Sequence, residues 1–351
     1  MSPPRLEVAE VFRRYQDAYL ATHSASFEQR RVIQDLIACR TAALGGHLLR
    51  CQECGHEQIA YNSCRNRHCP KCQAQKQAAW LEAQCAKLLE VPYYHIVFTL
   101  PQQLRPLALQ NKRVLYGLLF RAASETLSTI ARDPKHLGAK IGFTAVLHTW
   151  GQTLLHHPHL HCVVPGGGLS ADERCSMGAR EHFFLPVRVL SRLFREKYLC
   201  YLRQAYRAGE LVLEGRLKDL ALPRAWRAFL DPIGKIDGVV YAKAPFGSAE
   251  QVLKYLARYT HRVAISNQRL IALEDGQVAF RYKDYRQGRR ERVMRLEAVE
   301  FMRRFLLHVL PLRTYPSLRL SLEPLSKRKT AAVPEAPRFG WAVRRGAGKL
   351  D

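Results

Sequence analysis

The sequence predicts an α+β protein that begins with a small zinc-binding domain and continues into a larger domain built on an antiparallel sheet. Two C-x-x-C pairs lie close together near the N-terminus. Downstream, short runs rich in β-branched and aromatic residues alternate with stretches of helical periodicity. Glu274-Asp275-Gly276 separates two strand-like runs, which favours a hairpin. We therefore expect a helical zinc-binding domain at residues 1–91, a second domain at residues 92–311, and a basic, irregular tail at residues 312–351.

Charge and composition narrow the class of partner. The 351 residues suffice for two domains, and a hydrophobic content of 47% excludes a disordered chain. The formal net charge is +25, from 55 lysines and arginines against 30 acidic residues. This excess favours a polyanion such as a nucleic acid over a membrane surface, since the sequence contains no long apolar run. The N-terminus lacks a signal-peptide core, so we expect a cytoplasmic protein.

The N-terminal region combines two short helices with a cysteine cluster. Apolar residues recur at helical spacing over residues 8–15 and 32–43, where we expect packing helices. Ten cysteines in a cytosolic chain favour metal ligands over disulfides. The two C-x-x-C pairs, 14 residues apart, have the spacing of a four-cysteine zinc site, and Gly55 suits the tight turn after the first pair. The expected structural zinc ligands are Cys51, Cys54, Cys69 and Cys72.

Other residues near this cluster leave alternatives open. Cys64 and His68 are spare ligands, and either could replace one of the four cysteines. Arg65 and Arg67 would suit a DNA-contacting face, or they form a solvated basic rim on a structural element.

The second domain alternates strands and helices. Periodicity and β-propensity predict these elements in chain order: a strand at 94–101, a helix at 107–130, strands at 141–149 and 155–165, a helix at 190–206, a strand at 239–243, a hairpin at 269–282 and a helix from 299 to 309.

Two histidines in the strand at 155–165 are the first candidates for chemistry. Side chains alternate along a strand, so His159 and His161 point to one face while Leu160 points into the core. Two imidazoles on one face of a stiff element can bind a divalent metal. The alternative is a pair of surface or partly buried histidines without a metal.

Two tyrosines form the second candidate. Ser248 and Gln251 predict a capping box that opens a helix. Tyr255 and Tyr259 are four residues apart in it, so their hydroxyls share one face. The same residues also fit an apolar stripe, which would place both tyrosines in the core.

The combination of these motifs resembles a known family. An H-x-H strand followed by a Tyr-x-x-x-Tyr helix is typical of the HUH single-strand nucleases. The wider run, from His148-Thr149-Trp150-Gly151-Gln152 to Tyr255-Leu256-Ala257-Arg258-Tyr259-Thr260-His261-Arg262, resembles the two-tyrosine rolling-circle transposases of the insertion sequence 91 family. The resemblance covers roughly residues 30–311. It implies an RRM-like sheet of four or five strands with helices on one face, after a zinc-binding domain that helps to recognise DNA.

The resemblance also implies a mechanism. His159 and His161 would hold Mg²⁺ or Mn²⁺ with Gln152 as third ligand; His148 is a weaker candidate for that position. Tyr255 or Tyr259 would attack single-stranded DNA and form a 5′-phosphotyrosine. Lys254, Arg258 and Arg262 would clamp phosphates, or they form the solvated face of the helix. The chain contains no G-x-x-x-x-G-K-[ST] motif, so we expect no nucleotide triphosphate.

Two other functions remain open. One is an HUH replication initiator or relaxase, which would share the chemistry. The other is a zinc-ribbon nucleic-acid-binding protein in which the histidines and tyrosines are structural. The segment after residue 311 departs from the family pattern and reads as disorder.

Overall fold

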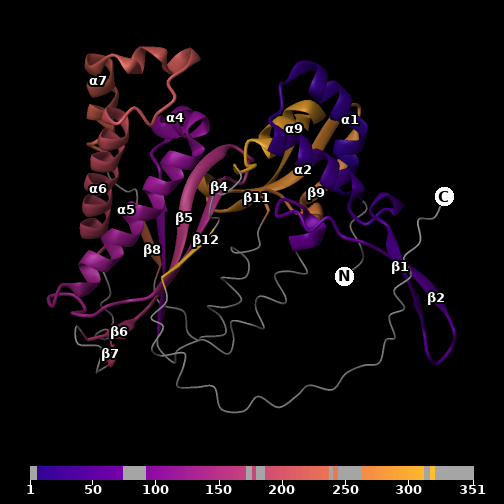
Figure 1. The fold of residues 1–351 in the computed structure, drawn as a ribbon, viewed down its shortest axis with the longest axis horizontal. Helices are drawn as coiled ribbons and strands as arrows, with labels where there is room; N and C mark the ends of the chain where they lie inside the picture. Colours follow the sequence, from indigo (N-terminus) through magenta and orange to yellow (C-terminus); the bar gives the residue numbers. More distant parts are fainter. Residues whose placement is uncertain are drawn as a thin grey trace. The chain divides into compact units, whose positions relative to one another are not determined.

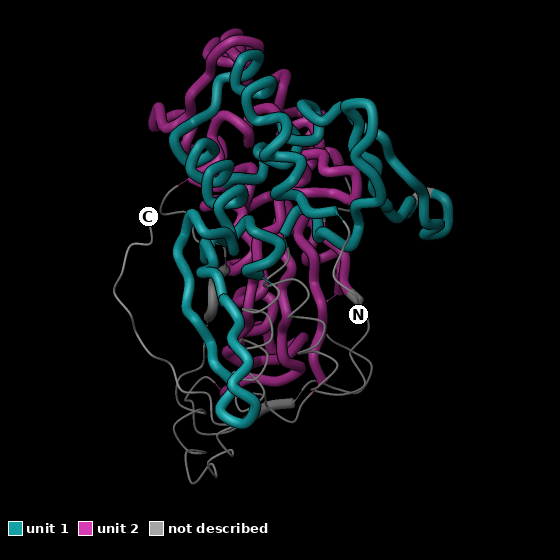
Figure 2. The backbone as a smooth tube through the Cα atoms, turned by 90° about the vertical axis from the view of Figure 1, so that its right-hand side faces the viewer, with its two compact units in different colours: residues 1–77, 261–309, 324–351 teal, residues 78–260, 310–323 magenta. Residues whose placement is uncertain are grey.

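The computed structural model describes residues 6–73, 92–170, 176–178, 186–236, 240–243, 263–311 and 317–320. The chain forms two compact units (Figure 2). Unit 1 consists of residues 1–77, 261–309 and 324–351, and unit 2 consists of residues 78–260 and 310–323.

Unit 2 is built on a five-stranded antiparallel sheet in the order β12-β4-β5-β3-β8 (Figure 1). The register sets Val97 opposite His161 across β3 and β5, and Leu147 opposite Leu160 across β4 and β5. The strand bounds are β3 Tyr93–Thr99, β4 Phe143–Trp150, β5 His156–Pro165, β8 Val240–Lys243 and β12 Ser317–Leu320. A small separate pair is formed by β6 Gly167–Leu169 and β7 Ser176–Gly178.

Helices pack against one face of this sheet, as the α+β prediction requires. The core contains Leu160 and Cys162 of β5 together with Leu119 of α5 and Phe194 of α6. Because side chains alternate along a strand, His159 and His161 lie on the opposite face from Leu160. The helices are α4 Arg105–Gln110, α5 Lys112–Arg132, α6 Val187–Arg207 and α7 Pro223–Ile233.

Unit 1 joins the N-terminal helices to a distant segment of the chain. A three-stranded antiparallel sheet, ordered β11-β10-β9, precedes α9. Phe12 of α1 meets Phe305 of α9 with ring centroids 5.2 Å apart. The Gln29 Nε2 donates to the Leu306 carbonyl at 3.0 Å. The elements are α1 Val8–Thr22, α2 Phe27–Ala38, β1 Gly46–Arg50, β2 Glu57–Tyr61, β9 Leu270–Glu274, β10 Gln277–Asp284, β11 Arg290–Glu297 and α9 Ala298–Leu306.

Two predictions about organisation differ from the structure. Residues 263–309 belong to unit 1, whereas we expected them in one domain with residues 92–262. The periodic pattern predicted their elements, but it carries no information on which distant helix α9 packs against. Within the tail, Ser317–Leu320 forms an edge strand on β4 instead of irregular chain. A short segment can pair in this way because a strand edge offers unpaired backbone groups.

Candidate functional site

Three histidines gather on the sheet face away from α5 and α6. His148 of β4 lies directly opposite His159 of β5, and His161 follows two residues later on the same face. One ligand nitrogen from each lies within 4.8 Å of the others. The ring centroids are 4.6 Å apart for His148 and His161, and 4.8 Å apart for His159 and His161. These distances suit three nitrogens around one metal ion.

Hydrogen bonds orient two of these rings. His159 Nδ1 lies 2.6 Å from the His157 carbonyl, which can only accept, so Nδ1 carries the proton and Nε2 carries the lone pair. His161 Nδ1 lies 2.8 Å from His95 Nε2, a buried contact. When His161 donates from Nδ1, its Nε2 also presents a lone pair. Such outer partners fix the tautomer of metal-binding histidines.

A further contact positions His157, the residue whose carbonyl accepts the hydrogen bond from His159. The Arg105 guanidinium donates to His157 Nδ1 at 3.1 Å. Burial, with a smaller effect of the Arg105 charge, lowers the pKa of His157 below its usual value. His157 is therefore neutral, with Nδ1 as acceptor. Arg105, His157 and His159 form a chain that holds the His159 ring.

Gln152, the third ligand we predicted, lies in the turn between β4 and β5 and is half-buried. This turn is closed by Gly151 N–H donating to the Leu155 carbonyl at 3.0 Å. His148 joins the two predicted histidines in the cluster. The sequence contains one indication that His148 belongs to the cluster, which is the short turn between β4 and β5. Because this turn folds β4 back on β5, residue 148 lies beside residue 159.

The predicted nucleophiles Tyr255 and Tyr259 lie outside the described residues, as do Lys254, Arg258 and Arg262.

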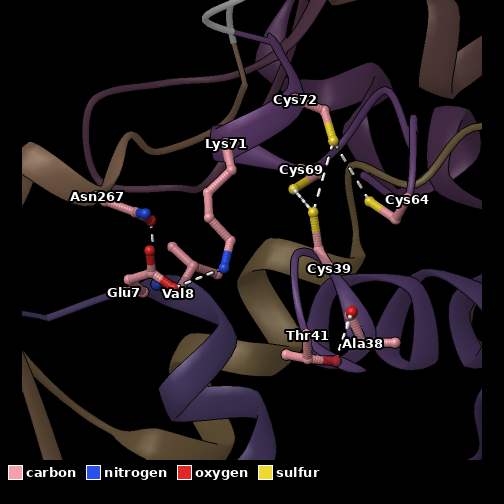
Figure 3. A network of polar contacts seen from close by, with 10 residues as sticks. All are labelled: Glu7, Val8, Ala38, Cys39, Thr41, Cys64, Cys69, Lys71, Cys72 and Asn267. Atoms are coloured by element: carbon pink, nitrogen blue, oxygen red, sulfur yellow. Dashed lines mark hydrogen bonds and ion pairs between the residues drawn. The ribbon is translucent and has the colours of Figure 1, made fainter. Parts of the chain in front are cut away.

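A second candidate metal centre lies in unit 1, where four cysteine sulfurs converge (Figure 3). The Cys39 sulfur lies 3.6 Å from Cys72 and 3.5 Å from Cys69, and Cys64 lies 3.6 Å from Cys72. Four thiolates at 2.3 Å around a tetrahedral zinc ion would be about 3.8 Å apart. Cys39, Cys69 and Cys72 are buried. The residues therefore fit a structural zinc ion.

This cluster differs from the predicted ligand set. Cys69 and Cys72 belong to it as predicted, and Cys64, which we left open as a spare ligand, takes part. Cys51 and Cys54 are not members; they lie in the turn between β1 and β2. Cys39 was missed because it stands alone at the end of α2, outside any C-x-x-C pair.

Polar contacts secure the loop that carries the cluster. Asn66 donates from Nδ2 to Asp35 at 2.8 Å, and its Oδ1 accepts the His68 N–H at 2.8 Å. Lys71 pairs with Glu7 at 2.8 Å (Figure 3). His68 contributes its backbone N–H to this loop, and its side chain is not part of the cysteine cluster.

The two predicted DNA-contacting arginines beside this cluster, Arg65 and Arg67, are exposed. Arg65 also lines an open hollow of about 660 Å³ with Arg40, His47 and Tyr61. Cations and an aromatic ring suit contact with a nucleic acid strand.

Comparisons with known proteins identify the family, and the zinc-binding region that they match contains the four-cysteine cluster. Residues 11–100 match a family described as "Transposase zinc-binding domain", and residues 142–316 match one described as "Putative transposase". The chain is 59% identical over 306 residues to "Putative transposase y4qJ" of Sinorhizobium fredii, covering 87% of this chain and 77% of the relative. It is 30% identical over 257 residues to the transposase for insertion sequence element IS801 of Pseudomonas savastanoi pv. phaseolicola, covering 72% of this chain and 60% of that protein. No solved structure matches.

The matched regions define a transposase with an N-terminal zinc-binding domain, and hence a DNA-binding protein. The chain belongs to the insertion sequence 91 family of transposases. Among the described helices, none has the length and apolarity needed to cross a membrane.

Proposed function

We propose that this transposase nicks and rejoins single-stranded DNA through a 5′-phosphotyrosine during rolling-circle transposition. The observation that carries the proposal is the three-histidine cluster of unit 2. His148, His159 and His161 come from two adjacent strands, and one ligand nitrogen of each lies within 4.8 Å of the others, an arrangement that suits a divalent cation.

His148, His159 and His161 would hold a divalent cation, with Gln152 as a further oxygen donor from the adjacent turn. Imidazole nitrogens suit Mn²⁺ better than Mg²⁺, which prefers oxygen ligands. When bound, the ion would supply Lewis acidity that neutralises charge on a scissile phosphate. The His157 carbonyl would hold His159 in the required tautomer, and the contact with His95 would do the same for His161 when its Nδ1 is the donor.

The covalent step would use Tyr255 or Tyr259. The phenolic oxygen forms a bond to phosphorus, the bond to the 3′-oxygen breaks, and the phenolic proton passes to a base or solvent. The phosphotyrosine conserves the energy of the phosphodiester, so rejoining needs no nucleotide triphosphate. Lys254, Arg258 and Arg262 would hold neighbouring phosphates.

The zinc-binding region would hold the element's DNA. Arg65 and Arg67 are exposed next to the cysteine cluster, and the net charge of +25 favours a polyanion. Zinc would act here as a structural ion, because all four ligand positions are filled by cysteines.

The test uses a labelled single-stranded oligonucleotide from the element's end, with Mn²⁺ and the full chain. Denaturing gels compare the wild type with Tyr255→Phe, Tyr259→Phe and His159→Ala. We expect a metal-dependent covalent band that disappears in at least one tyrosine variant and in His159→Ala. A folded, zinc-loaded protein that forms no band would contradict the proposal and favour a non-catalytic binding protein.

A further inference from the structure

The turn between β1 and β2 has the local geometry of a metal-binding knuckle. Cys51 N–H donates to the His56 carbonyl at 2.8 Å, and Gly55 N–H donates to the Cys51 carbonyl at 3.1 Å. Gly55 has a φ of +70°, which a residue with a side chain rarely adopts. The turn is therefore closed tightly around the two cysteines, and it presents Cys54 to solvent.

Backbone N–H groups of the turn point at the Cys51 sulfur. The pKa of Cys51 lies below its usual value because backbone N–H groups of Cys54 and Glu53 hydrogen-bond the sulfur, with a further contribution from the Cys54 side chain. Backbone donors aimed at the first sulfur of a C-x-x-C turn stabilise its anion, the form that binds a metal.

This turn supplies only half of a zinc site. Zinc in a structural site takes four ligands, and the turn provides two sulfurs. Among the residues that the structure describes, no third histidine, cysteine, aspartate or glutamate forms a group with Cys51 and Cys54. The other cysteine cluster is complete with its own four sulfurs, so it has no position for either of them.

The hairpin behind the turn also has an uncovered apolar face. Leu48 and Ile59 are cross-strand neighbours, 55% and 58% exposed, and Tyr61 lies on the same face with 44% exposure. The hairpin extends away from α1 and α2 (Figure 1). A two-stranded hairpin is marginal in water without packing on its face.

We propose that Cys51 and Cys54 of two copies of this chain bind one shared zinc ion, which makes the β1–β2 hairpin a dimerisation element. Two C-x-x-C turns give four sulfurs, and four thiolates select zinc with tetrahedral geometry. Zinc binding releases the thiol protons of both turns to solvent. This proposal does not depend on the nuclease chemistry of unit 2.

Charge at the end of the hairpin supports a second copy as the occupant. Arg50 and Glu57 face each other across β1 and β2, next to the turn, with 4.0 Å between Nε and Oε1. In a two-fold dimer the same surface of each copy faces the other copy in the opposite direction. A cation next to an anion on that surface can therefore meet the anion and the cation of the second copy. Arg50 would then approach Glu57 of the partner subunit, while Leu48 and Ile59 of both copies leave water.

The first experiment measures zinc content and native mass on the purified full chain, and it repeats the zinc measurement with His159→Ala so that zinc held by the three-histidine cluster is subtracted from every count. We expect about 1.5 zinc ions per chain in a dimer, one in each four-cysteine cluster and one shared. Changing both Cys51 and Cys54 to serine should lower this to about 1 and yield monomers, and the zinc that remains shows that the cluster of Cys39 is folded. Cys200→Ser removes another exposed cysteine and should change neither value.

Three results would overturn the proposal. One is about 1 zinc ion per chain in the wild type, unchanged by the double substitution. Another is about 2 zinc ions in a monomer, which would mean that the same chain completes the site. The third is a Cys51–Cys54 disulfide, seen as a mass two hydrogens lower with no metal at the turn.

A charge exchange tests the interface independently of the sulfurs. Arg50→Glu and Glu57→Arg should each raise the dimer dissociation constant about tenfold, because like charges then face each other across the two-fold axis. The double exchange should restore it. Dissociation constants that do not differ among the three variants and the wild type would contradict the two-fold arrangement.

Discussion

Replacing Cys39 by serine tests the four-cysteine cluster of unit 1 most directly. The Cys39 side chain is fully buried, and its sulfur lies within 3.6 Å of two others in the cluster. A serine hydroxyl is a poor zinc ligand, and the substitution would leave three sulfurs at a site made for four. Cys51→Ser is the matched comparison, because Cys51 was predicted from sequence to be a ligand of the same ion.

The loss of stability in Cys39→Ser can be estimated from the part of the zinc-binding free energy that one ligand contributes. Structural zinc contributes roughly 10–16 kcal/mol in small zinc-binding folds, so an equal division among four ligands gives roughly 3 kcal/mol each. A domain has about 5–15 kcal/mol of stability in total. We therefore expect Cys39→Ser to lower the melting temperature of unit 1 by about 10 °C. Cys51→Ser removes no ligand of this cluster, so it should leave the zinc ion of the cluster in place and lower the melting temperature of unit 1 by less than Cys39→Ser does.

The assay is thermal unfolding followed by circular dichroism, with and without a zinc chelator. The wild type and Cys51→Ser should both lose stability when the chelator is added, and Cys39→Ser should already be destabilised without it. If Cys51→Ser were the damaging change and Cys39→Ser the harmless one, the ligand set given by the structure would be wrong.

Three further predictions concern unit 2 and α9. His148→Ala should reduce Mn²⁺ affinity, measured by calorimetry, more than Gln152→Ala does, since the imidazole belongs to the cluster; the reverse order would refute this assignment. His95→Phe should weaken Mn²⁺ binding about 10–100-fold without unfolding the protein, because it removes the partner of His161 Nδ1; unchanged affinity would show that this contact does not orient the ring. The pKa of Glu300 is lowered to about 2, chiefly by hydrogen bonds from the neighbouring arginines, so its stabilisation is present above about pH 4.3 and is lost as the pH falls towards 2. Glu300→Gln should cost about 1 kcal/mol in urea unfolding at pH 6, after allowance for solvent screening, and almost nothing near pH 2; a difference that does not depend on pH would contradict the cause.

The sequence predicted local structure and missed long-range pairing. Strands and helices followed from periodicity, and the H-x-H spacing alone placed His159 and His161 on one face. The grouping of α9 with α1 depends on contacts such as Phe12 with Phe305, between residues almost 300 positions apart. Cys39 escaped prediction for the same reason, since only the fold brings the end of α2 beside Cys69.

The position of His148 shows how a site can be encoded by strand register. The pairing changes from His148 opposite His159 to Trp150 opposite His156, so β5 has one residue more than β4 over this interval. Such a bulge re-aims side chains and is common beside active sites. Pro158 lies in it, where the missing N–H costs no ladder bond, and its carbonyl accepts the Leu100 N–H at 3.1 Å. His156 and His159 are three residues apart and therefore point to opposite faces of β5, so His156 contacts the buried Tyr116 hydroxyl at 2.8 Å while His159 belongs to the three-histidine cluster. Two of the three histidines in the cluster are therefore readable as a local motif, and the third depends on the register of the neighbouring strand.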